Sequence, residues 1–408
     1  MKTAMMAFLF VASTASAHVA PLENFKHKPI LADLSDLRAL NIPVMAKDEA
    51  VGVGYAVVTP EMQQKIQARA HQVGKCGGFE DLSSEVNFTN DFAGMLKSLA
   101  EIKAKNDQYF AAPFRAQAVT KNPEIESAMN EVSEENLKAT VTWLSSYPNR
   151  YNRSSTPNVH VEEMKKRLEA MLASSKVPYE VSLISHGSTP QKSVRVRLTG
   201  STKPNEIVVL GGHLDSINQS WSGKSDAPGA DDNASGSANL VEVLRIVSQK
   251  AQPQRSVEFF WYAGEESGLL GSAEIAKSYK QEKKDVVAVL QLDMTLYPGS
   301  GEFVVGNMTD FTSSWLRDYF KAMNEAYIHG RIIDDQCGYG CSDHASWHRQ
   351  GYATLMPFEA RMNADNPFIH SSRDVINNDS NFKHSAMYSK IGVVFAMDLA
   401  NSDARQPY

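Results

Sequence analysis

The chain has 408 residues, enough for roughly two or three domains. Hydrophobic residues make up 42% of it and charged residues 22%, which is the balance of an ordinary globular protein. The formal net charge of −6 argues against a surface built for nucleic acid or anionic lipid, so we expect no nucleic acid and no membrane among its partners.

The first residues have the pattern of a secretory signal peptide. Lys2 precedes the apolar stretch Ala4–Ala12, and Ala15-Ser16-Ala17 looks like a cleavage site made of small residues. The apolar stretch is too short to span a bilayer. We therefore expect residues 1–17 to direct export, and the mature protein to be secreted, soluble and monomeric.

Three cysteines occur, and export into an oxidising compartment permits a disulfide. Cys337 and Cys341 lie in the segment Cys-Gly-Tyr-Gly-Cys, where the glycines allow a tight turn, and we expect them to pair. A pair of zinc thiolates is the alternative, which the lack of a second cysteine pair disfavours. Cys76 is left over.

Residues 18–118 contain no motif with recognisable chemistry. Helical patterns occur at Glu61–Val73 and Phe92–Lys105, and the segment Tyr109–Pro123, with its prolines and aromatics, indicates a boundary. In an exported chain, such a region ahead of a catalytic domain suggests a pro-domain, with an ordinary accessory domain as the alternative. We expect the pro-domain to be followed by a catalytic domain over 119–408.

From Ser133, a suitable helix cap, helical and strand patterns alternate along the chain. The other segments expected to be helical are Val159–Leu172, Asn233–Ser248, Ser272–Tyr279, Thr312–Tyr327 and Ala386–Leu399. The expected strands are Val181–Ser185, Val194–Leu198, Ile207–Leu210, Val257–Ala263, Val286–Leu292 and Ala353–Phe358. This alternation predicts an α/β domain with a mixed, mostly parallel central sheet flanked by helices.

Reactive side chains recur where these strands end. Ile207–Leu210 is an unbroken apolar run, typical of a strand buried on both faces, and His213 and Asp215 follow it. Because residues two apart in an extended segment point the same way, His213 can bind a metal ion while Asp215 orients its ring. A core histidine beside an exposed aspartate is the alternative.

Two pairs of adjacent acidic residues also lie in loops between the predicted strands and helices. Asp231-Asp232 lies directly before a predicted helix, where the acids could simply favour the helix N-terminus, although two adjacent acids repel unless a cation lies between them. Glu265-Glu266 follows an apolar strand. Since adjacent side chains point in different directions, one glutamate can bind metal while the other stands off by the width of a water. Two solvated loop acids are the alternative.

Two further residues complete the set of candidate metal ligands. Asp293 ends an apolar run, and His370 follows the proline-containing loop Asn366-Pro367-Phe368-Ile369. Nitrogen and carboxylate ligands without thiolates suit zinc, with cobalt or manganese possible. His344 and His348 form a rival pair on one helix face, but the glutamate of the zincin motif is absent between them.

Taken in order, these motifs resemble a known family. They are His213-Leu214-Asp215-Ser216, Ala227-Pro228-Gly229-Ala230-Asp231-Asp232, Glu265-Glu266, Leu292-Asp293-Met294, Cys337-Gly338-Tyr339-Gly340-Cys341-Ser342-Asp343-His344 and Asn366-Pro367-Phe368-Ile369-His370. The ordered set resembles the secreted bacterial leucine aminopeptidases of the co-catalytic zinc peptidase family M28, over residues 131–400.

The resemblance implies two zinc ions per chain, bridged by Asp232 and a hydroxide. It further implies that His213 and Asp293 complete one site and that Glu266 and His370 complete the other, with Glu265 as general base, Asp215 as support for His213 and Tyr339 as a donor to the oxyanion. Members of the family also often have a cis peptide bond after the bridging aspartate and a pro-segment that is removed on maturation.

By the same resemblance, an apolar slot receives the first side chain of the substrate. Its expected lining is Met294, Met356, Phe358 and Ile369, together with Cys337 and Cys341. Leucine or another large apolar residue would fit. Met362 and Asp365 stand where relatives carry aromatic rings, and Asp365 could admit a basic side chain.

The sequence therefore predicts a secreted zinc aminopeptidase that acts on peptides with a free N-terminus. A related metallopeptidase with a different end or side-chain preference is one alternative. A carboxypeptidase would need a cation for the substrate carboxylate, and Arg361 is the only arginine near the slot motifs. A metal-free binding module is a second alternative, disfavoured because every ligand position and Glu265 are present.

Overall fold

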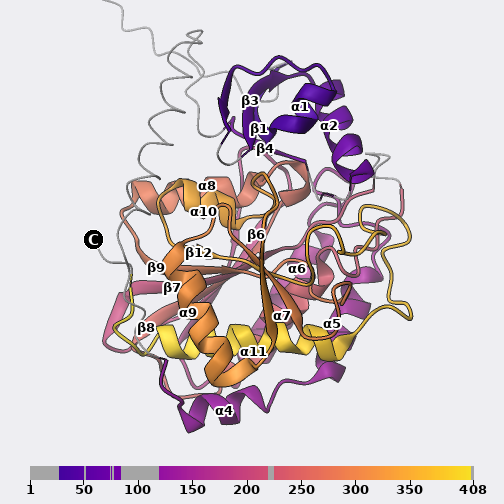
Figure 1. The fold of residues 1–408 in the computed structure, drawn as a ribbon. Coiled ribbons are helices and arrows are strands. Elements are labelled where there is room, and N and C mark those ends of the chain that lie inside the picture. Colours follow the sequence, from indigo (N-terminus) through magenta and orange to yellow (C-terminus); the bar gives the residue numbers. More distant parts are fainter. Residues whose placement is uncertain are drawn as a thin grey trace, which may run out of the picture.

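The computed structural model describes residues 27–49, 52–73, 75, 78–83, 119–218 and 225–405. The expected signal peptide, the expected helix Phe92–Lys105 and Cys76 lie outside these residues. The described chain forms a small N-terminal domain within residues 27–83 and a larger α/β domain from residue 119 onward (Figure 1). Among the described helices, none combines the length and the apolar character that a bilayer crossing requires.

A six-stranded sheet forms the centre of the α/β domain. Its strands, in spatial order, are β12 (Thr354–Leu355), β9 (Asp285–Gln291), β7 (Lys203–His213), β8 (Arg255–Tyr262), β6 (Ser193–Leu198) and β5 (Tyr179–Ile184). The first four run parallel to one another, whereas β6 and β5 are antiparallel to their neighbours. The predicted mixed, mostly parallel sheet is thus confirmed.

Helices cover both faces of this sheet, which explains its unbroken apolar strands. On one face, Ile207 and Val209 pack with side chains of α8 (Leu270–Gln281) and α10 (His344–Arg349). On the other face, Val208 and Leu210 belong to the main core. That core also contains side chains of α4 (Pro123–Met129), α5 (Glu134–Ser145), α6 (Val159–Leu172), α7 (Ala234–Val247), α9 (Ser314–Met323) and α11 (Phe382–Leu399).

Two segments differ from the elements expected for them. The expected helix Thr312–Tyr327 is α9 followed by a wider π-type turn, η3 (Asn324–Ile328). The expected strand Ala353–Phe358 divides into β12 and β13 (Pro357–Phe358). Pro357 has no N–H to extend the ladder with β9, and the chain crosses instead to a second sheet. That sheet has the order β11 (Arg331–Asp335), β10 (Val304–Met308), β13.

The N-terminal domain is an antiparallel sheet with helices on one face. Its strand order is β2 (Ala46–Asp48), β3 (Val53–Val58), β1 (Lys28–Asp33), β4 (Phe79–Asp81), and its helices are α1 (Leu34–Ala39) and α2 (Pro60–Gln72), the latter close to the helical pattern expected from the sequence. Leu31 pairs with Tyr55 on one side and with Glu80 on the other, so these three side chains share the sheet face opposite the helices. In Figure 1 this domain sits above α8 and α10.

Candidate metal centre

The predicted site residues gather at the C-terminal edge of the central sheet. His213 is the last residue of β7, and Asp293 lies two residues beyond the end of β9. Glu265 and Glu266 open the short helix η2 (Glu265–Ser267) that follows β8. Parallel strands bring their carboxyl ends to one edge, which is where ligands bind in open α/β sheets.

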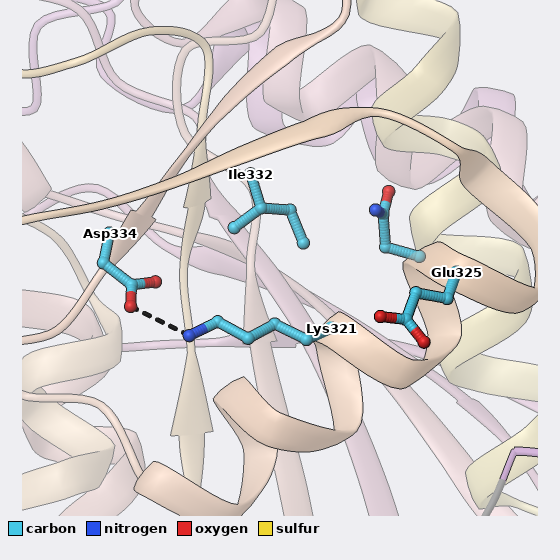
Figure 2. A pocket seen from close by; sticks show the side chains of 5 residues that line it. Lys321, Glu325, Ile332 and Asp334 are labelled. Atoms are coloured by element: carbon cyan, nitrogen blue, oxygen red, sulfur yellow. Dashed lines mark hydrogen bonds and ion pairs between the residues drawn. The ribbon is translucent and has the colours of Figure 1, made fainter.

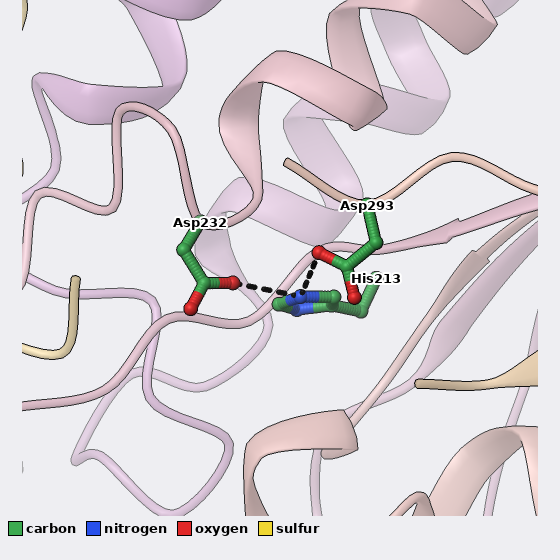
Figure 3. Close-up of side chains that lie close together, drawn as sticks. All are labelled: His213, Asp232 and Asp293. Carbon is green, nitrogen blue, oxygen red and sulfur yellow. Dashed lines mark ion pairs between the residues drawn. The ribbon is translucent and has the colours of Figure 1, made fainter. Parts of the chain in front are cut away.

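His213, Asp232 and Asp293 form one cluster (Figure 3). His213 Nε2 lies 3.0 Å from Asp232 Oδ1 and 3.3 Å from Asp293 Oδ1. The ring and both carboxylates are buried. Three ligand atoms therefore converge on one small space from three separate segments of the chain.

Asp232, Glu266 and His370 form the second cluster. His370 Nε2 lies 2.8 Å from Asp232 Oδ2 and 2.9 Å from Glu266 Oε2. The two oxygens of Asp232 therefore face two different histidines. The peptide bond between Asp232 and Asn233 is cis, as the resemblance implied.

The donor set fits two divalent cations. His213 Nε2, Asp293 Oδ1 and both oxygens of Glu266 are buried and make no hydrogen bond among the described residues. Buried polar atoms in folded proteins are normally hydrogen-bonded. Within each cluster the ligand atoms lie within 4.8 Å of one another, and imidazole with carboxylate is a ligand set that zinc accepts.

Asp215 braces the site in two ways. His213 Nδ1 is 3.1 Å from the Asp215 main-chain oxygen and 3.5 Å from its carboxylate, so the carbonyl is the nearer partner of the ring. The carboxylate accepts hydrogen bonds from the backbone amides of Glu265 at 3.1 Å and Glu266 at 3.3 Å. Asp215 thereby ties the end of β7 to the loop that carries both glutamates.

The two glutamates differ in their distance from the imidazoles. Glu266 Oε2 lies 2.9 Å from His370 Nε2, whereas Glu265 Oε2 lies 3.9 Å from His213 Nε2. Burial raises the pKa of the Glu265 carboxyl well above its usual value. Burial and the neighbouring Asp232 raise the pKa of Glu266 to about 7. Glu266 thus belongs to a cluster that could hold a metal ion, whereas Glu265 lies outside both clusters.

A hydrogen bond that orients the Asp293 carboxylate was not predicted from the sequence. Ser342 Oγ donates a hydrogen bond to Asp293 Oδ2 at 2.5 Å. The amide nitrogen of Gln291 donates to Ser342 Oγ and to Asp343 Oδ2, both at 3.0 Å. Since the serine oxygen accepts from Gln291, its own proton is directed to Asp293. The signal was present in Gln291-Leu292-Asp293 and Cys341-Ser342-Asp343, but only the fold brings these segments together.

Further buried acids surround the two clusters. They are Asp215, Asp231, Glu265, Asp343, Glu359 and Asp374. Burial and the neighbouring Asp231 raise the pKa of Glu359 well above its usual value. The region is more acidic than the three ligand carboxylates alone suggest.

The residues expected to line an apolar slot lie together beside this site. Met294, Met356, Phe358 and Ile369 belong to one buried cluster with Tyr339. The expected disulfide joins Cys337 to Cys341 in the same cluster. Met362 is also a member, with its Sδ 3.7 Å from Cys337 Sγ, whereas Asp365 is half-buried nearby in the chain.

The N-terminal domain contributes to this same cluster. Leu31, Val53 and Leu82 pack against the slot residues. Glu80 and Arg349 form a buried ion pair across the two domains. Gln67 donates a hydrogen bond to the main-chain oxygen of Glu266 at 3.1 Å, beside the second metal cluster.

The rival residues lie elsewhere. His344 and His348 are buried on α10 and belong to neither metal cluster found among the described residues. Burial lowers the pKa of each to about 3, so both are neutral core histidines. Arg361 pairs with Asp335 at 3.3 Å and its side chain is 50% exposed, so it does not supply the slot with the cation that a carboxypeptidase needs.

A separate hollow of about 310 Å³ lies against α9, η3 and β11 (Figure 2). Lys321 and Asp334 form an ion pair of 2.8 Å on one side of it. Asn324 exchanges two hydrogen bonds of 2.9 Å with Gly330. None of its lining residues belongs to either metal cluster. Three of its polar side chains, those of Lys321, Asn324 and Asp334, already form the hydrogen bonds and the ion pair given above.

A sheet edge that carries two buried imidazole and carboxylate clusters, joined by one aspartate, defines a metal-dependent hydrolase. Residues 193–406 match the model of peptidase family M28, and the chain belongs to that family. It is a zinc-dependent peptide hydrolase.

Several sequence relatives are fungal proteins named as leucine aminopeptidases or probable leucine aminopeptidases. A probable leucine aminopeptidase of Arthroderma benhamiae is 37% identical over 287 residues, which cover 69% of this chain and 78% of that protein. Leucine aminopeptidase 1 of Trichophyton equinum is 37% identical over 281 residues, or 66% of this chain and 74% of that protein. These relatives do not support the bacterial origin that the sequence motifs suggested.

Its structural relatives are bacterial. The LapA aminopeptidase of Legionella pneumophila superposes with a TM-score of 0.77 at 26% identity, over 92% of this chain and 99% of that one. LapB of the same organism superposes with a TM-score of 0.78 at 23% identity, over 92% and 100%, and shows the shared fold.

Proposed function

We propose that this protein is a secreted, zymogen-type aminopeptidase that releases large apolar N-terminal residues from peptides. Two zinc ions would occupy the two clusters, with His213 and Asp293 at one, Glu266 and His370 at the other, and Asp232 shared. One observation carries the proposal: the oxygens of Asp232 lie 3.0 Å from His213 Nε2 and 2.8 Å from His370 Nε2, on opposite sides of one carboxylate.

When bound, the zinc ions supply Lewis-acid polarisation of the scissile carbonyl and acidify a water at neutral pH. Glu265 is the general base: its raised pKa suits it to take the proton of that water and to pass it to the leaving amine. Tyr339, 1% exposed at the slot, is proposed to donate to the developing oxyanion. The substrate's free amine is expected at the Glu266 and His370 end of the site.

The slot supports the preference for a leucine-like first residue. Met294, Met356, Phe358 and Ile369 offer an apolar lining, and methionine side chains adapt their shape to different occupants. A side chain of this size gains about 1.5–3 kcal/mol when it is fully buried. Large apolar residues should therefore be released faster than small or acidic ones.

The N-terminal domain supports the zymogen proposal. Its residues Leu31, Val53 and Leu82 occupy the apolar cluster that the substrate side chain would enter. The backbone amide of Asp81 donates to the Gly268 oxygen at 3.1 Å, close to the loop that carries Glu265 and Glu266. A peptide could not fill the slot while this domain is docked, so activity requires its removal.

The test is a purified, processed sample assayed on leucine p-nitroanilide, with and without a chelator, together with zinc analysis. We expect two zinc ions per chain, activity that the chelator abolishes and zinc restores, and no release from peptides with a blocked N-terminus. Zinc-free protein, or equal cleavage of blocked peptides, would contradict the proposal. Parallel assay of the unprocessed chain should give little activity.

Export is proposed from the apolar stretch Ala4–Ala12 and its flanking residues. Expression in the native host, followed by N-terminal sequencing of the protein in the medium, tests it. Recovery of the chain only inside the cell, with Met1 retained, would contradict it.

A further inference from the structure

Arg150 is a buried cation that no sequence motif singled out. It lies between α5 and α6, and its side chain is completely shielded from solvent. Among the described residues it forms no ion pair with a carboxylate; the acids that influence it most are Asp374, Asp215 and Asp232. Burial lowers its pKa to about 10, so it keeps its charge at neutral pH.

The guanidinium donates to main-chain oxygens of three chain segments, one of which is the start of the loop that carries Asp232. Nε donates to the Leu214 oxygen at 2.9 Å, between His213 and Asp215 in the chain. Nη1 donates to the Pro228 oxygen at 2.5 Å, and Nη2 to the Gly229 oxygen at 2.9 Å. A third segment, at the end of α5, is held through the Leu144 oxygen at 3.0 Å.

Gly229 permits this close approach. Its φ is +54°, a backbone conformation that favours glycine. A Cβ at this position would lie 2.4 Å from the main-chain oxygen of Asp232 and 2.9 Å from Arg150 Nη2. The loop before Asp232 is therefore shaped to lie directly against the guanidinium.

Asp374 holds the other end of the same loop. Its Oδ1 accepts from the Asp231 amide and its Oδ2 from the Asp232 amide, both at 3.0 Å. Its own main-chain oxygen accepts from the Ala230 amide at 3.1 Å. The guanidinium thus holds the carbonyls at the start of the loop, and the carboxyl group of Asp374 holds the amides at its end.

We propose that Arg150 and Asp374 are positioning residues that fix the Asp232 carboxylate between the two metal positions. The inference rests on the proposed zinc sites. Partners of metal ligands typically change metal affinity about 10–100-fold when they are removed. Lysine cannot replace Arg150, because its single ammonium cannot reach three segments that a planar fork with five donors reaches.

The experiment measures zinc binding by the full-length chain. Arg150→Lys, Arg150→Met and Asp374→Asn are compared with wild type by competition with a chelator, and the cobalt-substituted proteins by visible absorption. Arg317→Met is the matched control, since Arg317 also donates to main-chain oxygens, those of Thr309 and Thr312, on a segment that carries no metal ligand. Circular dichroism and thermal unfolding of the metal-free proteins monitor folding.

We expect both Arg150 variants and Asp374→Asn to weaken zinc binding about 10–100-fold and to alter the cobalt spectrum. Arg317→Met should retain wild-type affinity and spectrum. If Arg150→Met fails to fold, Arg150→Lys and Asp374→Asn carry the test. Wild-type affinity in these two variants would overturn the inference, as would an equal loss in Arg317→Met. Absence of zinc binding by wild type would instead refute the proposed function.

Discussion

Two buried surfaces meet beneath the N-terminal domain, and they balance charge in different ways. At the metal centre, acids such as Asp232, Glu266 and Asp293 greatly outnumber the one buried arginine, Arg150. At the domain interface, the buried acid Glu80 faces Arg349, and the buried Asp81 pairs with Lys28. An excess of buried acids must be neutralised by bound cations or by protonation, whereas a matched pair requires neither.

This difference in charge balance distinguishes a metal-binding site from a contact between two domains. Changes at the metal centre should alter turnover and metal binding while the two domains stay docked. Changes at the Glu80 interface should alter docking and leave the chemistry of the processed enzyme intact. The following variants test that separation, beginning with the largest expected effect.

Glu265→Gln should lower kcat about 10²–10⁴-fold, because the variant loses the proposed proton acceptor and keeps the side chain's size. Zinc content should remain that of wild type, as measured by atomic absorption alongside leucine p-nitroanilide kinetics. Glu242→Gln is the matched control: Glu242 is also buried, but its carboxylate accepts from Ser133 and Arg245 and belongs to neither metal cluster. A kcat within a few-fold of wild type for Glu265→Gln would show that Glu265 is not the general base.

Asp232→Asn should weaken zinc binding by more than about 100-fold, since one substitution removes a charged ligand from both clusters. The variant should also unfold at a lower temperature, because metal binding stabilises only the folded chain. Chelator competition and calorimetry measure the two effects. Asp398→Asn serves as control, because Asp398 accepts a hydrogen bond from Tyr319 and lies outside both clusters. Two tightly bound zinc ions in Asp232→Asn would disprove the bridge.

The metal centre could be predicted because its signals are local. His213, Asp293 and the Glu265-Glu266 pair each follow an apolar run, and the side-chain period of a strand orients them. The same apolar runs predicted the central sheet. The pair Asp231-Asp232 stood out in its glycine-containing loop before a helix, where Asn233 caps α7 through the Gly236 amide at 2.9 Å, and only the family resemblance singled out Asp232.

The supports could not be predicted because their partners are distant in the chain. Arg150 binds the oxygen of Gly229, 79 residues away, and a main-chain oxygen has no signature in a sequence. Glu80 meets Arg349 across 269 residues. The strands β1 and β3 do contain buried apolar residues, but without a chemical motif nothing in the sequence indicated which surface their outer face would cover.

Glu80→Gln in the unprocessed chain should raise its leucine p-nitroanilide activity about 10–100-fold. Arg349 would remain buried without its charged partner, and breaking a buried pair in this way destabilises the contact by about 3–5 kcal/mol. The processed enzyme should show wild-type kinetics, whichever variant it came from. Glu49→Gln is the control in the same domain, since Glu49 forms an exposed pair with Lys47. Unprocessed wild type as active as processed enzyme would refute the covering role.

Asp365→Asn carries the smallest expected effect and bears on the slot alone. Asp365 is half-buried, and burial raises its pKa to about 7, with the acids Asp231 and Asp232 adding to the shift. If this carboxylate faces the first side chain of the substrate, the wild-type enzyme should accept lysine p-nitroanilide, and Asp365→Asn should shift preference toward leucine by on the order of tenfold. Asp379→Asn, on an exposed turn, should leave the ratio unchanged. A wild-type lysine rate far below that for leucine, unaltered in Asp365→Asn, would exclude a basic-residue preference and leave the methionine-lined slot as the sole determinant.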